Sequence, residues 1–328
     1  MIEEVPPEAP LGAHVRTLAR GPGRSRSLTR DEAQSAMRLM LSGDADPHAI
    51  GAVLMLMRMK GETADEIAGF AAAAQASLPD LPRPALDWPS YAAGRTRGLP
   101  WFLLSARLVA DAGHPVLMHG WNGADRAIRD GLDGAGIPFA EDPSKTRALM
   151  ERHGIVYLPL ETLSPDLFRL LTLRSVLHLR SCVNTVCRML NPGRAERSVQ
   201  GVFHPPYRLL QQDAGALLGL DSLTVIKGGG GEFERHPGKA IAGFGLRGGT
   251  SFDGDFPALT TGEARRLDGG ESDGAMVPAL WRGELDDPFA EDVVCGTAAL
   301  ALDTLGVADP EKTARHLWAQ RRQAVSLV

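Results

Sequence analysis

Four consecutive glycines are flanked by charged residues that could hold a cation or an anion. Lys227 precedes Gly228–Gly231, and Glu232, Glu234 and Arg235 follow. Side chains two residues apart in an extended segment point to the same side, so Glu232 and Glu234 could offer two carboxylates to Mg²⁺. The glycines would let an anion approach the backbone closely. The alternative is a flexible loop in which Glu232 pairs with Arg235.

A second cluster mixes arginines with aromatic rings. Arg95 and Arg97 lie in the segment 91–101, which begins with a tyrosine and ends with a tryptophan. Arginine contacts phosphates and aromatic rings stack on bases, so this mixture favours single-stranded nucleic acid. The alternative is that the rings pack beneath the loop, and the rings concerned are Trp88, Trp101 and Phe102.

Charge is unevenly distributed along the 328 residues. The formal net charge of −5 argues against nucleic-acid binding, but eight basic residues face four acids between Arg16 and Lys60. Six arginines face two acids between Asp166 and Arg197, whereas nine acids face three arginines between Glu263 and Asp292. A positive face is therefore possible despite the negative total, unless the charges merely solvate helix faces.

Other reactive side chains give weaker signals. Three cysteines are too few for a disulfide framework, and Cys182 and Cys187 are expected to be buried thiols. His119 is expected to be a satisfied, partly structural histidine. No apolar run is long enough to span a membrane, and the N-terminal residues lack the features of a signal peptide. We therefore expect a cytoplasmic protein.

Helix-capping signals dominate the first 80 residues. Thr29 with Glu32 and Thr63 with Glu66 form capping boxes, and Asp46 precedes a proline at the first helical position. These signals predict three short helices. Residues 79–89 are rich in proline and predict a linker.

Short apolar runs alternate with helical patterns after residue 90. This alternation predicts an α/β sheet with covering helices, ending in a helix pair that breaks near residue 309. The predicted strands are 114–118, 154–159, 198–203, 222–226 and 240–246.

Several motifs together resemble a known family. The segments 28–33 and 55–70 are similar to the N-terminal helical domain of anthranilate phosphoribosyltransferases and pyrimidine nucleoside phosphorylases. The segments 118–120, 180–192 and 295–300 are similar to its Lys-His-Gly-Asn, Arg-Thr-x-x-Asn…Leu-x-Asn-Pro and Asn-Ala-Ala-x-x-Leu motifs. The resemblance implies a small all-α domain, residues 1–80 completed by helices near 165–190. It also implies a larger α/β domain, residues 81–328, and a homodimer formed through the α domains.

The phosphate-binding motifs of that family are altered. Its Gly-Thr-Gly-Gly-Asp loop falls at 90–94, where the chain has Ser-Tyr-Ala-Ala-Gly, and its Asn-x-Ser-Thr turn falls at 100–103, Pro-Trp-Phe-Leu. The altered loops resemble those of the YbiB-type paralogues, which keep the fold, lack the anthranilate reaction and bind nucleic acid. Arg174 matches an arginine that the family places near the anthranilate carboxylate.

The sequence therefore predicts a catalytically diverged member of this glycosyl transferase family that binds single-stranded nucleic acid along a basic dimer face. The alternative is a glycosyl- or phosphoribosyltransferase with a different substrate, with Glu232 and Glu234 on Mg²⁺. No other cofactor is expected. The residues expected to contact nucleic acid or another anion are Arg58, Lys60, Arg95, Arg97, His119, Arg174, Arg180 and Lys227.

Overall fold

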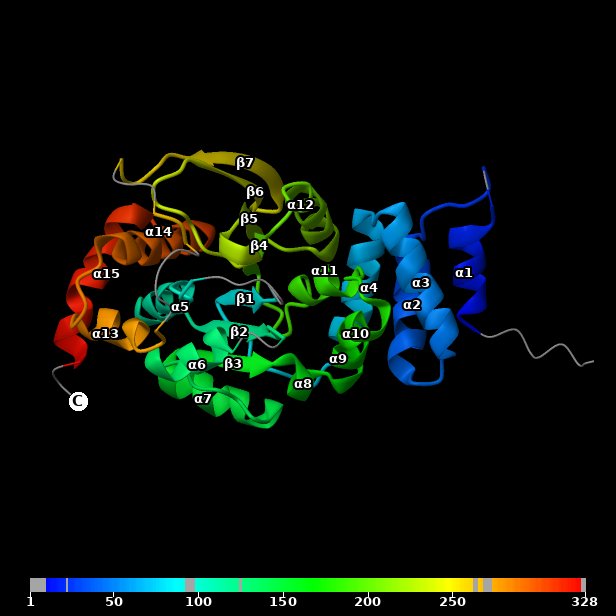
Figure 1. The fold of residues 1–328 in the computed structure, drawn as a ribbon, viewed down its shortest axis with the longest axis horizontal. Coiled ribbons are helices and arrows are strands. Elements are labelled where there is room, and N and C mark those ends of the chain that lie inside the picture. Colours follow the sequence, from blue (N-terminus) through cyan, green and yellow to red (C-terminus); the bar gives the residue numbers. More distant parts are fainter. Residues whose placement is uncertain are drawn as a thin grey trace, which may run out of the picture. The chain divides into compact units, whose positions relative to one another are not determined.

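The chain forms two compact units. The computed structural model describes residues 10–21, 23–91, 98–123, 126–261, 265–267 and 273–325 (Figure 1). Unit 1 consists of Met1–Leu78 and Ser164–Leu190, and unit 2 consists of Pro79–Leu163 and Asn191–Val328. None of the helices in the described ranges has the length and hydropathy of a membrane span.

Unit 1 is all helical. Both predicted capping boxes are present, because each threonine side chain accepts a hydrogen bond from the backbone of its glutamate and each glutamate accepts one in return. Asp46 caps the next helix as predicted. One short helix, α1, was not predicted, because it has no side-chain cap to mark its start. The described helices of unit 1 are α1 (Gly12–Ala19), α2 (Arg30–Ser42), α3 (Pro47–Lys60), α4 (Ala64–Ala76), α9 (Pro165–Thr172), α10 (Arg174–Leu177) and α11 (Val183–Arg188).

Helices α2 and α4 pack closely against each other. Gly69 makes this possible, since a Cβ atom there would lie 2.3 Å from the carbonyl oxygen of Arg30. Met37, Met40 and Met57 are fully buried in the same unit. Flexible thioether side chains fill irregular gaps, so they suit a core that contains few aromatic rings.

Unit 2 is built on a mixed sheet with the strand order β3-β2-β1-β4-β5-β6-β7. The first five strands in this order are parallel, and β6 and β7 are antiparallel to their neighbours. The five predicted strands are present, and β7 was not predicted. The strands are β1 (Leu86–Ser90), β2 (Val116–Gly120), β3 (Ile155–Pro159), β4 (Arg197–Val202), β5 (Ser222–Lys227), β6 (Ile241–Arg247) and β7 (Thr250–Phe256).

The predicted linker is wrong at its C-terminal end, because residues 86–90 form the central strand β1. A proline normally argues against a central strand, since it cannot donate a hydrogen bond to the ladder. Here β1 and β4 pair only at Asp87↔Ser198, so the ladder between these two strands does not include Pro89. All five residues of β1 are buried.

Helices cover both faces of the sheet. On β5, the Thr224 hydroxyl lies 2.6 Å from that of Thr304 on α14, whereas the adjacent Leu223 contacts Gly215 on α12. Successive strand residues point to opposite faces, so α14 and α12 lie on different sides. The helices of unit 2 are α5 (Phe102–Asp111), α6 (Ala127–Gly134), α7 (Thr146–His153), α8 (Leu160–Leu163), α12 (Tyr207–Leu218), α13 (Met276–Arg282), α14 (Pro288–Thr304) and α15 (Pro310–Val325), with 3₁₀ turns at Pro143–Lys145 and Gly229–Gly231.

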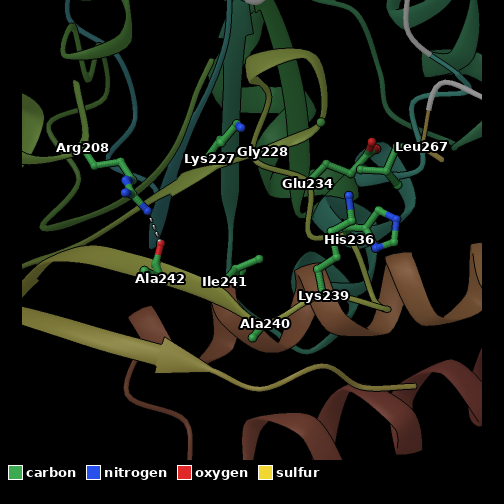
Figure 2. A pocket seen from close by; sticks show the side chains of 11 residues that line it. Arg208, Lys227, Gly228, Glu234, His236, Lys239, Ala240, Ile241, Ala242 and Leu267 are labelled. Atoms are coloured by element: carbon green, nitrogen blue, oxygen red, sulfur yellow. Dashed lines mark hydrogen bonds between the residues drawn. The ribbon is translucent and has the colours of Figure 1, made fainter. Parts of the chain in front are cut away.

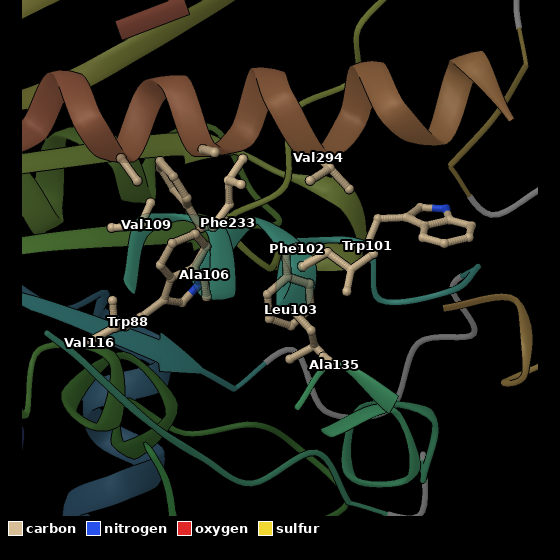
Figure 3. Close-up of a cluster of buried hydrophobic side chains, with 14 of the residues drawn as sticks. Trp88, Trp101, Phe102, Leu103, Ala106, Val109, Val116, Ala135, Phe233 and Val294 are labelled. Carbon is tan, nitrogen blue, oxygen red and sulfur yellow. The ribbon is translucent and has the colours of Figure 1, made fainter. Parts of the chain in front are cut away.

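The aromatic rings near the arginine-rich loop belong to the core. Trp88 stacks on Phe102 at 6.5 Å between ring centroids and meets Phe233 edge-on at 5.4 Å. Trp101 is 3% exposed and belongs to the same cluster (Figure 3). The expectation that these rings stack on bases is therefore wrong. Trp88 on β1 packs against Phe102 at the start of α5, so the contact between this strand and its covering helix takes these rings away from solvent.

Candidate functional site

The carboxyl ends of the parallel strands place the altered motifs at one edge of the sheet in unit 2. β1 ends at Ser90, β2 at Gly120 and β5 at Lys227. Loops at the carboxyl ends of parallel strands are where open α/β sheets usually bind ligands. Asn122 connects two of these ends, since its Nδ2 donates to Ser90 Oγ (3.2 Å) and to Glu232 Oε1 (3.3 Å).

The two carboxylates of the glycine-rich segment are both buried. Glu232 is 1% exposed and Glu234 is 2% exposed. Glu234 Oε2 accepts a hydrogen bond from the backbone N–H of Phe102 at 3.0 Å, at the start of α5. The Arg235 guanidinium forms an ion pair with Glu311 on α15, with Nη1 and Oε1 3.6 Å apart.

These carboxylates do not form a ready-made metal cage. Within the described residues, no group of three or more His, Cys, Asp or Glu side chains is placed to hold a metal ion. One oxygen of each carboxylate already accepts a hydrogen bond from a protein donor. A Mg²⁺ ion here would depend on the remaining carboxylate oxygens together with water and ligand phosphates, which is how Mg²⁺ commonly binds.

The glycines serve the fold of this segment. A Cβ atom on Gly228 would lie 1.6 Å from the carbonyl oxygen of Glu232, and one on Gly201 would lie 2.0 Å from the carbonyl carbon of Glu232. Gly230 adopts a left-handed conformation with φ of 60°. The chain therefore folds back on itself and on β4 at distances that only glycine permits.

His119 belongs to a fully buried polar chain that crosses three strands. Its Nδ1 lies 2.8 Å from the Tyr91 hydroxyl, and its Nε2 lies 3.1 Å from Asp87 Oδ1. Asp87 Oδ2 accepts a hydrogen bond from Ser198 Oγ at 2.8 Å. Nδ1 thus has a hydrogen-bonding partner, whereas Nε2 faces the Asp87 carboxylate without a hydrogen bond, and the ring is fully buried. The same contacts contradict the expectation that His119 contacts an anion.

Lys227 does reach a cavity, and it shares that cavity with Glu234. The walls also carry Arg208 on α12 and Lys239 just before β6 (Figure 2). Arg208 and Lys239 could not be predicted from the sequence, since they come together only through the order of strands β4, β5 and β6. No spacing in the sequence links them to the glycine run.

The remaining candidate residues lie in unit 1 or outside the described residues. Arg58 and Arg174 are exposed, and Arg180 is partly exposed. Lys60 differs from them, because its Nζ donates to the buried Glu66 Oε2 at 2.8 Å and to Ser27 Oγ at 3.1 Å. Lys60 is therefore engaged in the fold of unit 1. Arg95 and Arg97 lie outside the described residues.

The cysteines are buried thiols, as predicted. Burial raises the pKa of Cys182 and of Cys187 well above the ordinary thiol value, and it raises the pKa of Cys295 to about 12. Thiols are weak nucleophiles and poor metal ligands when they stay protonated. The cysteines are therefore not candidates for chemistry.

Comparisons with known proteins agree with this architecture. Residues 14–78 match the sequence model described as "Glycosyl transferase family, helical bundle domain". An anthranilate phosphoribosyltransferase of Halobacterium salinarum is 30% identical over 301 residues, covering 86% of each chain. One of Chlamydia felis is 34% identical over 183 residues, a match that spans 55% of this chain and 53% of the relative.

Solved structures give the same fold. The anthranilate phosphoribosyltransferase of Thermus thermophilus superposes with a TM-score of 0.79 at 24% identity, covering 95% of this chain and 96% of that one. The enzyme of Saccharomyces cerevisiae, in complex with PRPP and Mg, superposes with a TM-score of 0.73 at 15% identity, covering 97% and 98%. A helical domain combined with a larger mixed α/β sheet domain is thus the phosphoribosyltransferase-type fold. The match with the H. salinarum enzyme places the chain in the anthranilate phosphoribosyltransferase family.

Proposed function

We propose that the protein is a catalytically diverged member of this family that binds single-stranded nucleic acid through its phosphates. The observation that carries the proposal is a set of exposed arginines on unit 1 that form no ion pair with any described residue. They contrast with Arg26, which holds Glu32, and Lys60, which holds Glu66. The exposed arginines are Arg20, Arg24, Arg30, Arg38 and Arg58.

The altered phosphate loops support divergence from the anthranilate reaction. In the alignment made from the sequence, Tyr91 stands where the family has a threonine. Its side chain is buried and its hydroxyl contacts His119. At the second loop, Trp101 and Phe102 are part of the core. Neither position offers the small hydroxyl or amide groups that would bind a pyrophosphate.

Phosphate contacts, rather than base stacking, are the expected mode of binding. The rings of Trp88, Trp101 and Phe102 are buried, whereas five arginines of unit 1, Arg20, Arg24, Arg30, Arg38 and Arg58, are exposed. Binding through phosphates releases counterions, so affinity should fall steeply with salt and show little base preference. Arg174 and Arg180 of unit 1, and Arg95 and Arg97 of unit 2, stay proposed contacts with the phosphates of the nucleic acid.

The proposed homodimer would double the number of these arginines. Each exposed arginine would occur twice, so a strand could neutralise more phosphates than a single chain allows. Light scattering coupled to gel filtration measures the mass directly. A monomeric mass, together with a short site size on a long oligonucleotide, would contradict the proposed dimer. It would not contradict the proposal that the arginines of unit 1 bind nucleic acid.

The test is fluorescence anisotropy of a labelled single-stranded oligonucleotide over a salt series. The log–log slope should be roughly −0.7 for each phosphate neutralised. Charge reversal at Arg38 and Arg58 together should weaken binding by at least roughly tenfold at low salt and should reduce the slope. Reversal of Arg152, an exposed arginine of unit 2, is the matched control. Unchanged affinity in R38E/R58E and in R95E/R97E/R174E would overturn the proposal.

One observation favours a second candidate, a transferase that uses a phosphorylated sugar donor and Mg²⁺. Glu232 and Glu234 are neighbouring buried carboxylates at the carboxyl edge of the sheet. A ligand of the folded state raises its melting temperature, so an enzyme should be stabilised by phosphoribosyl pyrophosphate with Mg²⁺. Stabilisation that is lost in E232Q and E234Q would favour the transferase. Stabilisation by oligonucleotide alone would favour the nucleic-acid binder.

A further inference from the structure

A cavity with a volume of about 350 Å³ lies in unit 2 beside the glycine-rich segment (Figure 2). It is bounded by the first turn of α12, the end of β5, the residues after the glycines and the start of β6. Cavities of this size suit small ligands such as a pentose or a nucleoside with one phosphate. The residues that carry charge or hydrogen-bonding groups into it are Arg208, Lys227, Glu234, His236 and Lys239.

The cations of this cavity differ in how firmly they are held. Arg208 is fixed, because its Nη1 donates to the carbonyl of Ala242 at 2.9 Å and its Nε to that of Pro205 at 3.2 Å. Its guanidinium carbon lies 4.5 Å from the centre of the Phe244 ring. Lys227 and Lys239 are exposed, and neither forms an ion pair within the part of the chain that the structure describes. One guanidinium held by hydrogen bonds and two exposed ammonium groups therefore line the same cavity.

Among the described residues that line the cavity, Glu234 is the one carboxylate, and its Oε2 accepts the Phe102 N–H. His236 adds no charge in this arrangement. Its Nε2 donates to the carbonyl of Arg265 at 2.8 Å, and its Nδ1 accepts the N–H of Gly238 at 3.1 Å. This pair of bonds requires the neutral ring.

We propose that this cavity binds a phosphomonoester, with the phosphate held by Arg208, Lys227 and Lys239. A dianionic phosphate balances the excess of positive charge among the described lining residues, and Nη2 of Arg208, which donates to neither carbonyl, offers it a charged N–H donor. The organic part of the ligand lies against the apolar stretch Ala240–Ala242 and Leu267. Two sources share this chemistry: a free sugar or nucleoside phosphate, and the phosphorylated end of a strand.

The first experiment uses ribose 5-phosphate and the full-length protein in isothermal titration calorimetry. Binding should weaken at least roughly tenfold in K227A/K239A, since two charge-assisted contacts are lost. Both lysines are exposed, so the variant should fold normally. K312A, which removes an exposed lysine of α15, is the matched control. Ribose without phosphate should not bind.

The source is decided by oligonucleotides with and without a 5′-phosphate. If the protein binds the 5′-phosphorylated oligonucleotide more tightly than the unphosphorylated one, and K227A/K239A removes this difference, the ligand is the end of a strand. If the protein binds both oligonucleotides with equal affinity, the ligand is the free ester. No binding of ribose 5-phosphate, or equal binding by wild type and K227A/K239A, would overturn the proposal. R38E/R58E should bind ribose 5-phosphate normally, so failure here is distinguishable from failure of the nucleic-acid proposal.

Discussion

Glu32 shows how a capping residue also takes part in an ion pair. Its Oε2 accepts the backbone N–H of Thr29 at 2.8 Å, and the Arg26 guanidinium donates to both of its carboxylate oxygens at 2.6 and 2.7 Å. The hydrogen bond from Arg26, with help from Thr29, lowers the pKa of Glu32 from 4.5 to about 2. The sequence predicted the cap but not the ion pair, because Arg26 lies before the helix, where no periodic pattern applies.

This lowered pKa makes a prediction about stability in acid. A carboxyl whose pKa is lower in the folded state stabilises the protein above the unfolded value, and this contribution is lost as the pH falls. Glu32→Gln keeps one oxygen to accept the Thr29 N–H, and it removes the charge together with one acceptor of the Arg26 guanidinium. Because the pair is partly exposed, we expect a loss of about 0.5–1 kcal/mol at pH 7. The difference from wild type should vanish as the pH falls from 4.5 to about 2.

Urea denaturation at several pH values measures this difference. Asp31→Asn, which removes an exposed charge from the same helical turn, is the control. A difference between wild type and Glu32→Gln that stays constant down to pH 2 would show that the ion pair with Arg26 contributes nothing.

Elements are positioned by contacts that no single segment encodes. Gly201 on β4 lies against the backbone of Glu232 and Phe233, which fixes where the glycine-rich segment passes the sheet. The position of Glu234 in turn depends on Phe102 at the start of α5. These contacts join residues about thirty and a hundred and thirty positions apart.

A methyl group at Gly201 should displace that segment. The new Cβ would lie 2.0–2.4 Å from backbone atoms of Glu232 and Phe233, which cannot move as a flexible side chain would. We expect Gly201→Ala to lower the free energy of unfolding by about 3 kcal/mol, as for an overpacked core. Gly51→Ala on α3 meets nothing within 4 Å and should raise it by about 0.5–1 kcal/mol. If the two substitutions change the free energy of unfolding equally in thermal or urea denaturation, the glycine-rich segment can move away from β4 without cost.

The sequence predicted the parts of the structure that depend on local patterns. Capping boxes fixed the starts of α2 and α4, and apolar runs fixed most of the strands. Strand β1 was predicted as part of a linker, because it contains a proline and follows a proline-rich segment, a composition typical of linkers. Among the residues that line the cavity, Lys227 and Glu234 were predicted from the sequence as site residues. The positions of Arg208 and Lys239 in the cavity depend on the order of the strands in the sheet, which a single sequence does not reveal.

At the scale of the molecule, tryptophan fluorescence distinguishes the two units. All five tryptophans lie in unit 2, and unit 1 contributes only to the helical circular-dichroism signal, which both units share. Glu66 is a sensitive point in unit 1, because its buried carboxylate accepts hydrogen bonds from Leu28 N (2.8 Å), Thr63 N (2.9 Å) and Lys60 Nζ (2.8 Å). Tryptophan fluorescence therefore reports on the unfolding of unit 2, whereas a substitution at Glu66 changes the stability of unit 1.

Glu66→Gln should destabilise unit 1 selectively. It leaves Lys60 without its partner charge and sets an amide N–H₂ against backbone donors, a loss of roughly 2–4 kcal/mol. Domains with separate cores need not unfold together. We expect part of the helical circular-dichroism transition in urea to move to lower concentration while the tryptophan transition stays in place. Asp65→Asn, exposed on the same helix, should change neither. Equal shifts of both signals would mean that the units unfold as one.

The interrupted course of unit 1 along the chain also affects its synthesis on the ribosome. Its first four helices emerge early, but α9, α10 and α11 follow only after β1, β2 and β3. The 85 residues from Pro79 to Leu163 separate the two parts of unit 1. At 5–20 residues per second their synthesis delays completion of unit 1 by about 4–17 s. During that time β1 also lacks β4, its neighbour in the finished sheet. Apolar helix faces and an unpaired strand edge are then exposed together, so the newborn chain should depend on chaperones most at this stage.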